Sequence, residues 1–258
     1  MAEIEIFPLL NELSAFLESL EEAIIWRLIG RVQFRHNPWV YEAGRSGFAN
    51  ELSDSLFYVR LRHQEQMDAV FGRYTVPEER PYSPRLPPVQ RTLTPPGITF
   101  PISDYNNINL MPDIARSYCE LVPKICRPGS DEFSRYCAEY DVFAVQALSR
   151  RIHYGAFYVA ERKYRDAPDF YRTLIDSGDP GAIMEALTRH DVEEAIIRRV
   201  REKAETIQGY ASPSRIRLPP EAVSDFYGDV IIPLTREGEV LYLMNRGRDE
   251  DTPSRHKH

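Results

Sequence analysis

The chain has 258 residues, a formal net charge of -7 and 43% hydrophobic residues, which is ordinary globular composition rather than disordered or fibrous composition. The acidic balance argues against a general nucleic-acid binder, which needs a basic face. No apolar run reaches the ~18 residues of a membrane span, and the first ten residues carry acids where a secretory signal needs basic residues. We therefore expect a cytoplasmic protein with neither a nucleic acid nor a membrane as its partner.

Apolar residues at helical spacing predict a long first helix from Ile4 to Arg35, which Asn37-Pro38 ends. A helix of this length needs packing partners along its whole length, which favours a bundle or a dimer seam. The same spacing predicts a second helix from Glu51 to Tyr74.

The next segment, Val76–Pro101, holds eight of the chain's 20 prolines. Proline lacks the backbone N–H and fixes φ, so neither a long helix nor a central strand fits here. We interpret the segment as an extended surface connection between helices. The alternative is a proline-rich peptide ligand, for which the polyproline spacing is poor.

Helical periodicity then returns and continues almost to the end of the chain. The predicted ranges are Met111–Cys126, Asp131–Arg165, Pro168–Ser177, Pro180–Arg189, Val192–Gly209 with Asp191 as its cap, and Pro219/Pro220 to Asn245. Pro233 and Gly238 lie inside the last range and predict a kink there. No segment alternates with period two, so we expect an all-α fold: one helical-bundle domain over residues 1–247, with a polar, disordered tail over 248–258.

Common catalytic and metal-binding motifs are missing from the sequence. It has no glycine-rich phosphate loop, no HExxH, no GxSxG and no EF-hand loop. The three cysteines form no CxxC, and we expect them to pack as small hydrophobic residues. The histidines show no metal-ligand spacing, and we expect His153 to be a structural residue.

Polar residues interrupt the apolar helical stripes at three places. Arg151 shares its stripe with alanines and tyrosines, where a guanidinium is costly to bury unless it meets an anion; the alternative is a salt bridge to another helix. Arg189 and Glu193 lie four residues apart, and so do Thr235 and Glu239. An ordinary ion pair and a solvated helix face would explain these two pairs. Together the three places predict a polar pocket inside the bundle, lined by cations and one or two carboxylates.

Two runs of sequence are specific: Leu148–Gly155 reads Leu-Ser-Arg-Arg-Ile-His-Tyr-Gly, and Ile232–Glu237 reads Ile-Pro-Leu-Thr-Arg-Glu. With Leu20–Ile25, Val159–Glu161 and Val192–Glu194 in the same order, nearly the whole chain resembles the all-helical fungal and plant chorismate mutases. The resemblance implies a homodimer that catalyses the Claisen rearrangement of chorismate, a small dianion, to prephenate. That reaction is unimolecular and needs no nucleophile, metal or cofactor. The enzyme must hold both carboxylates, select the compact conformer and stabilise negative charge on the ether oxygen.

Matched position by position, the resemblance assigns roles to individual residues. Arg151 matches the family's carboxylate-binding arginine, and Lys163 matches the lysine that donates to the ether oxygen and to a carboxylate. Glu193 matches the acid that contacts the substrate hydroxyl, and Thr235 matches the threonine of the last helix. Glu239 matches the second contact to the ether oxygen, and it must be protonated to donate.

Departures from the family pattern change the cations of this pocket. The family's first-helix arginine is Ser14 here, and the asparagine four residues before the hydroxyl-binding acid is Arg189. We expect Arg189 to replace the missing arginine as a substrate-binding residue. The substrate is then chorismate or a close anionic enol-ether relative. The alternative is that Arg189 pairs with Glu193 and plugs the pocket of an inactive paralogue, which acts as a binding or regulatory partner.

One residue is also inserted between Gly155 and Glu161. On an unbroken helix of ~3.6 residues per turn, Arg162 rather than Lys163 would share the face of Arg151. We predict a π-bulge or local break within Gly155–Ala160, which absorbs the extra residue and brings Lys163 into the pocket.

The regulatory site, at which the fungal enzymes bind tyrosine or tryptophan, is altered as well. Gly72-Arg73 stands in place of its paired arginines, and Arg135-Tyr136 in place of its Gly-Ser turn. We therefore do not expect regulation by aromatic amino acids.

Overall fold

The computed structural model describes residues 7–50, 53–93, 102, 105–210, 212 and 214–250, with side chains described as far as residue 246. Its helices are α1 (Leu10–Arg31), α2 (Leu56–Val70), α3 (Met111–Ile125), α4 (Ser134–Tyr154), α5 (Ala160–Asp166), α6 (Pro168–Ser177), α7 (Pro180–Leu187), α8 (His190–Gly209), α9 (Pro220–Phe226) and α10 (Ile232–Glu250). Short 3₁₀ turns and two π turns join some of them, and the described residues contain no strand. The predicted all-α fold is confirmed. Within this part of the chain, no helix has the length and apolarity needed to cross a bilayer.

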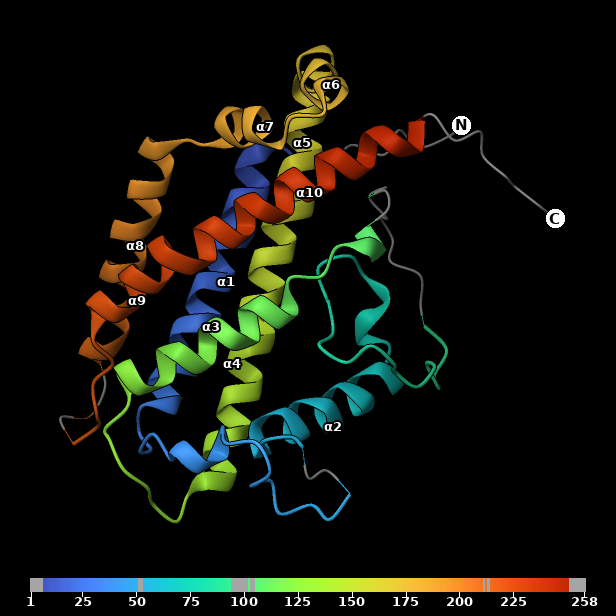
Figure 1. Ribbon diagram of the computed structural model, residues 1–258. Coiled ribbons are helices and arrows are strands. Elements are labelled where there is room, and N and C mark those ends of the chain that lie inside the picture. Colours follow the sequence, from blue (N-terminus) through green and yellow to red (C-terminus); the bar gives the residue numbers. More distant parts are fainter. Residues whose placement is uncertain are drawn as a thin grey trace.

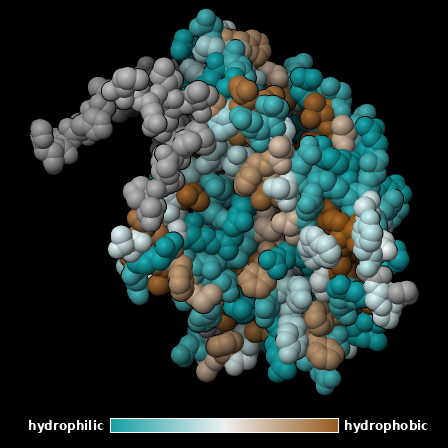
Figure 2. All heavy atoms as spheres, turned by 180° about the vertical axis from the view of Figure 1, so that it is seen from behind, coloured by the Kyte–Doolittle hydropathy of each residue, from teal (hydrophilic) through white to brown (hydrophobic). Residues whose placement is uncertain are grey.

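One long helical rod organises the fold. It consists of α4, a π turn over Gly155–Val159 and α5, and α1 packs beside it (Figure 1). Helices α3 and α10 cross the rod, while α6 and α7 lie at its far end. Gly30 permits the close contact of α1 with α4, because a Cβ there would lie 2.2 Å from the Tyr140 ring. From the opposite side the surface is mostly hydrophilic, with hydrophobic residues in separate groups (Figure 2).

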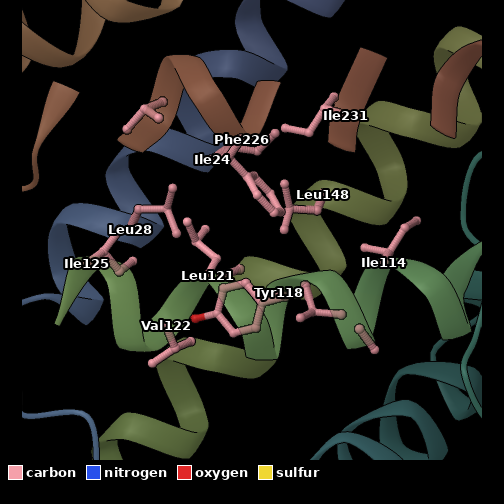
Figure 3. Close-up of a cluster of buried hydrophobic side chains, with 14 of the residues drawn as sticks. Ile24, Leu28, Ile114, Tyr118, Leu121, Val122, Ile125, Leu148, Phe226 and Ile231 are labelled. Atoms are coloured by element: carbon pink, nitrogen blue, oxygen red, sulfur yellow. The ribbon is translucent and has the colours of Figure 1, made fainter. Parts of the chain in front are cut away.

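The main core lies where α1, α3, α4 and α9 meet (Figure 3). Ile24, Tyr118 and Leu148 are fully buried there, and Phe226 is 7% exposed. Burying one such side chain contributes ~1.5–3 kcal/mol relative to leaving it in water. The core therefore fixes the rod and α1, the two elements that also form one side of the pocket described below.

The first two helices are shorter than their periodicity predicts. Residues 7–9 are not helical, so α1 begins at Leu10, and it ends at Arg31 instead of Arg35. Helix α2 begins at Leu56, where the Ser55 hydroxyl accepts a hydrogen bond from the Tyr58 amide. It ends at Val70, shortly before Gly72, whose φ of 88° lies in the left-handed region. The predicted starts at Ile4 and Glu51 lie outside the described residues. Apolar spacing continues past these ends, but caps and a left-handed glycine stop the helices.

The proline-rich connection forms no helix over residues 76–93, which agrees with the prediction. The buried Glu65 carboxylate of α2 holds it, accepting from the amides of Tyr82 and Ser83 and from the Ser83 hydroxyl. Residues 94–101 of the predicted connection lie outside the described residues.

Later helices follow the predicted ranges with corrections at several ends. Helix α4 begins at Ser134 rather than Asp131, and α8 begins at His190 rather than Val192. Helix α7 ends at Leu187 rather than Arg189, because Thr188 has extended backbone angles. The N-cap of α8 is Arg189 and no side chain caps it, so the prediction of Asp191 as cap was wrong. Helix α10 continues to Glu250, past the predicted end at Asn245, and residues 251–258 of the predicted tail lie outside the described residues.

The kink predicted around Pro233 takes the form of a π turn, Tyr227–Ile231, which ends two residues before that proline. A proline ring clashes with the carbonyl four residues earlier, and the wider turn relieves this clash. Gly238 serves close packing instead, because a Cβ there would lie 2.6 Å from the Ala156 Cβ in the other π turn. The two irregular turns thus lie on the two elements that flank the pocket.

Candidate active site

A cavity of about 280 Å³ lies between α1, the α4–α5 rod, α8 and α10. All six predicted site residues line it: Arg151, Lys163, Arg189, Glu193, Thr235 and Glu239. The structure therefore brings together side chains that are up to 88 positions apart, from Arg151 to Glu239. The remaining walls are mostly aliphatic, which lowers the local dielectric and strengthens every charge interaction inside.

Arg151 lies in the last turn of α4 and is 4% exposed. Its Nε and Nη1 atoms are buried and have no hydrogen-bond partner among the described residues. Burial lowers the pKa of this guanidinium from its ordinary value. Gly155 keeps the space beside it open, because a Cβ there would lie 3.1 Å from Nη1. Unpaired buried donors on a cation are costly, so this arrangement is suited to an anionic ligand.

The π turn over Gly155–Val159 confirms the predicted break within Gly155–Ala160. Beyond it, Lys163 faces the cavity, where its Nζ lies 3.1 Å from Glu239 Oε1 and 3.4 Å from Oε2. Arg162 instead pairs with Asp166 one turn further along the same helix. The extra residue is therefore absorbed in the turn, and Lys163 rather than Arg162 enters the pocket.

Glu239 lies on α10 and is 4% exposed. Burial raises the pKa of its carboxyl above the ordinary value, and the charges of Lys163, Arg151 and Arg236 oppose this without cancelling it. A raised pKa favours the protonated acid, which can donate a hydrogen bond. Glu239 thus has the environment that a donor carboxyl requires.

The wall formed by the start of α8 differs from the predicted arrangement. Glu193, with which Arg189 would pair in the alternative interpretation, instead has its Oε1 3.5 Å from Nη1 of Arg236. The Arg189 guanidinium lies at the rim, 65% exposed, and donates to both carboxylate oxygens of Asp191 at 3.2 and 3.1 Å. Arg189 precedes the first turn of α8 with non-helical backbone angles, so the helical four-residue spacing does not place it over Glu193.

Thr235 and Ser14 both use their hydroxyl groups within their own helices. Thr235 donates to the Ile231 carbonyl at 2.6 Å, and Ser14 donates to the Leu10 carbonyl at 2.8 Å. Ser14 lines the cavity with Leu10 and Leu17, so among the described residues on the α1 wall none is charged.

Arg236 also lines the cavity and was missed by the sequence analysis. It comes one residue after Thr235 in the first turns of α10, and its Nη1 donates to the Thr188 hydroxyl at 3.0 Å. A signal was present in the sequence, because Arg236 and Glu239 are three residues apart and therefore share a helix face.

The polar residues expected to be structural lie outside this pocket. The buried His153 accepts a hydrogen bond from the Leu110 amide through Nε2 at 3.0 Å, and its Nδ1 lies 2.8 Å from the Ser149 carbonyl oxygen. Burial lowers the pKa of His153 to about 3, so the imidazole is neutral at physiological pH. Cys126 and Cys137 are free and buried, and burial raises the pKa of each thiol to about 11.

The chain matches no protein-family model, but it is similar to individual known proteins. It is 38% identical to chorismate mutase 1, chloroplastic, of Petunia hybrida, over 88% of this chain and 72% of that protein. It is 35% identical to a chorismate mutase of Trichoderma parareesei, over 95% of this chain and 96% of that protein. Among solved structures it is similar to a chorismate mutase from Candida albicans in complex with L-Trp, with a TM-score of 0.86, 32% identity, and coverage of 94% and 93% of the two chains.

Proposed function

The chain belongs to the family of fungal and plant chorismate mutases, and from this premise we propose that it converts chorismate to prephenate in the pocket around Arg151. The observation that carries the proposal is the pair of buried Arg151 donors, which have no partner in the described part of the chain and lie beside the Lys163–Glu239 pair. In the rearrangement one C–C bond forms and the ether C–O bond breaks within a single molecule. The protein therefore needs to bind, orient and stabilise charge, and these are tasks for cations and hydrogen-bond donors.

Arg151 binds one carboxylate of the substrate. Two adjacent guanidinium donors fit the two oxygens of a carboxylate, and a lysine does not reproduce this geometry. The low-dielectric position of Arg151 strengthens this contact relative to the same contact in water.

Lys163 and Glu239 stabilise the ether oxygen as it gains negative charge. When Glu239 is protonated, it can donate to that oxygen, and the Lys163 ammonium is released from its carboxylate to donate as well. The raised pKa of the buried Glu239 supports this role. Because these contacts are strongest in the transition state, they increase kcat rather than only affinity.

The remaining predicted residues complete the site. Glu193 accepts from the substrate hydroxyl, and Thr235 borders the bound substrate on α10. Arg189, exposed at the rim, attracts the dianion through its field and contacts it only loosely.

The uncharged α1 wall around Ser14 favours a second candidate, an inactive paralogue that binds or regulates a partner. A prephenate-formation assay on the purified protein separates the two. We expect turnover of chorismate. If none occurs, a chorismate titration distinguishes an enzyme for a related enol ether, which binds chorismate, from an inactive scaffold, which does not.

We further propose that the protein is a cytoplasmic homodimer, as the resemblance and the sequence predict. Met67 and Phe71, four residues apart at the end of α2, expose apolar side chains that a partner subunit could cover. Light scattering coupled to size-exclusion chromatography tests the oligomeric state. A monomer at micromolar concentration would exclude the dimer.

A further inference from the structure

The pocket must hold two carboxylates if its substrate is chorismate, but Arg151 accounts for only one of them. The α1 wall cannot supply a second cation, because its described lining residues are Leu10, Ser14 and Leu17. The Ser14 hydroxyl is occupied by the Leu10 carbonyl at 2.8 Å. Leaving a carboxylate unpaired in an apolar wall is costly, so another cation must meet it.

Lys163 and Arg189 are poor candidates for this contact. The Lys163 ammonium is positioned against Glu239. The Arg189 guanidinium is 65% exposed and held by both oxygens of Asp191. Exposed charge pairs of this kind contribute little binding energy, because water and salt screen them.

Arg236 has the properties that Arg189 lacks. Its side chain is 25% exposed, and its Nε atom is buried without a hydrogen-bond partner in the described part of the chain. Nη1 is held by the Thr188 hydroxyl at 3.0 Å and lies 3.5 Å from Glu193 Oε1, so the guanidinium is fixed in place at the cavity wall. Its charge acts on the Glu239 carboxyl, as does the charge of Arg151.

We propose that Arg236 is the second carboxylate-binding cation of this pocket and that it makes the site selective for a dianion. The proposal rests on the proposed function. The second carboxylate is then held from α10, beside Thr235, while the uncharged α1 wall contacts the hydrocarbon part of the substrate. Arg236 does this without moving far, because Thr188 and Glu193 already fix its orientation.

The first test compares kcat/KM for chorismate among three single variants. Arg236→Gln should lower kcat/KM at least about tenfold, mainly through KM, because it removes a hydrogen bond to a charged group. Arg162→Gln is the matched control, because Arg162 is 21% exposed and pairs with Asp166 outside the pocket; it should stay within about twofold of wild type. Thr188→Val removes a partner of Arg236 but keeps its charge, so its loss should be smaller than that of Arg236→Gln. Equal losses in Thr188→Val and Arg236→Gln would mean that Arg236 only holds the α7–α8 junction, and would overturn the proposal.

The second test measures binding instead of turnover, first in the wild-type protein and then in Arg236→Gln. Its probe is an unreactive bicyclic dicarboxylate ether that imitates the transition state, together with its two monomethyl esters. In wild-type protein both monoesters should bind at least about tenfold more weakly than the diacid, because each loses a guanidinium partner. In Arg236→Gln one of these two penalties should disappear. If only one ester binds more weakly than the diacid in wild type, or if both penalties persist in the variant, the proposal is wrong.

These outcomes separate the inference from the proposed function. A wild-type protein that neither converts chorismate nor binds the diacid overturns both. If the wild-type protein converts chorismate and binds the diacid, and Arg236→Gln equals it in both turnover and binding, only the role of Arg236 is overturned.

Discussion

Two buried arginines of this fold have opposite surroundings. Arg31, at the end of α1, is fully buried, and its Nε donates to Asp141 at 2.6 Å. Its Nη1 donates to the Arg35 carbonyl at 3.1 Å, and its Nη2 donates to the Tyr41 hydroxyl at 3.1 Å. Arg151, buried almost as completely, leaves both Nε and Nη1 without a partner among the described residues.

The counter-ion of Arg31 is equally well satisfied. Asp141 accepts from Arg31, from the Tyr41 hydroxyl at 2.7 Å and from the Tyr118 hydroxyl at 2.7 Å. A buried ion pair whose donors and acceptors are all used links helices and has no capacity for a ligand. A buried guanidinium with unused donors costs stability, and its retention points to binding. The contrast therefore assigns Arg31 to the fold and Arg151 to the site.

Asp141→Asn should have the largest effect of these substitutions, and it should change the free energy of unfolding without changing substrate affinity. It leaves the Arg31 charge buried without its counter-ion, which costs ~3–5 kcal/mol of the free energy of unfolding. Urea denaturation measures this loss. The control is Asp166→Asn in the exposed pair with Arg162, which should cost no more than ~1 kcal/mol. A loss in Asp141→Asn as small as in the control would contradict the structural role.

Arg151→Ala should show the reverse pattern. The variant should fold with unchanged or greater stability, because an unpaired buried charge is removed, and its affinity for the substrate should fall by ~1.5–3 kcal/mol or more. Arg150→Ala is the matched control, since Arg150 pairs with Glu79 away from the pocket. Unchanged affinity in Arg151→Ala would refute its role as carboxylate anchor, and an unfolded variant would favour the salt-bridge alternative.

Glu239 should give the enzyme a pH signature. Burial raises its pKa, and the protonated form is the one that donates. The rate should therefore be highest below that pKa and fall, by about tenfold per pH unit, as pH rises above it. Glu239→Gln should flatten the profile, because an amide donates at any pH. His153 cannot produce this fall, since its pKa is about 3. An unchanged profile in the variant would remove Glu239 from the mechanism.

Arg189→Asn should have the smallest effect. Removing an exposed rim cation should weaken binding by no more than ~1 kcal/mol at low salt, and by less as salt increases. Titrations at two ionic strengths measure this. A loss of tenfold at both would make Arg189 a direct anchor, as the sequence predicted. A gain in affinity would mean that it plugs the pocket, and Ser14→Arg should then restore activity.

The sequence predicted the features that depend on local periodicity. Helical phase on an unbroken helix favoured Arg162, but the residue inserted relative to the family predicted a π turn near Gly155 with Lys163 in the pocket. The structure has both of these features. Polar interruptions of the apolar stripes pointed to five pocket residues, and the family resemblance added Lys163 and the individual roles. The local rules failed where backbone conformation changes, as at Arg189, which precedes α8 and turns away from Glu193.

The Arg31–Asp141 ion pair and the pocket position of Arg236 were not predicted from the sequence. Arg31 and Asp141 are 110 residues apart, and no spacing rule connects them before the fold is known. Arg236 has a local signal, because its three-residue spacing from Glu239 places both on one helix face, but neither the four-residue pairs nor the family resemblance points to it.

Ligand-induced stabilisation compares the two arginines in one experiment. The melting temperature of wild type, Asp141→Asn and Arg151→Ala is measured with and without the unreactive bicyclic dicarboxylate. A ligand that binds only the folded state raises stability by RT ln(1 + [L]/Kd). We expect the ligand to raise the Tm of wild type and of the less stable Asp141→Asn, and to leave the Tm of Arg151→Ala unchanged. An equal rise in Arg151→Ala, or no rise in wild type, would contradict the assignment of the two buried arginines.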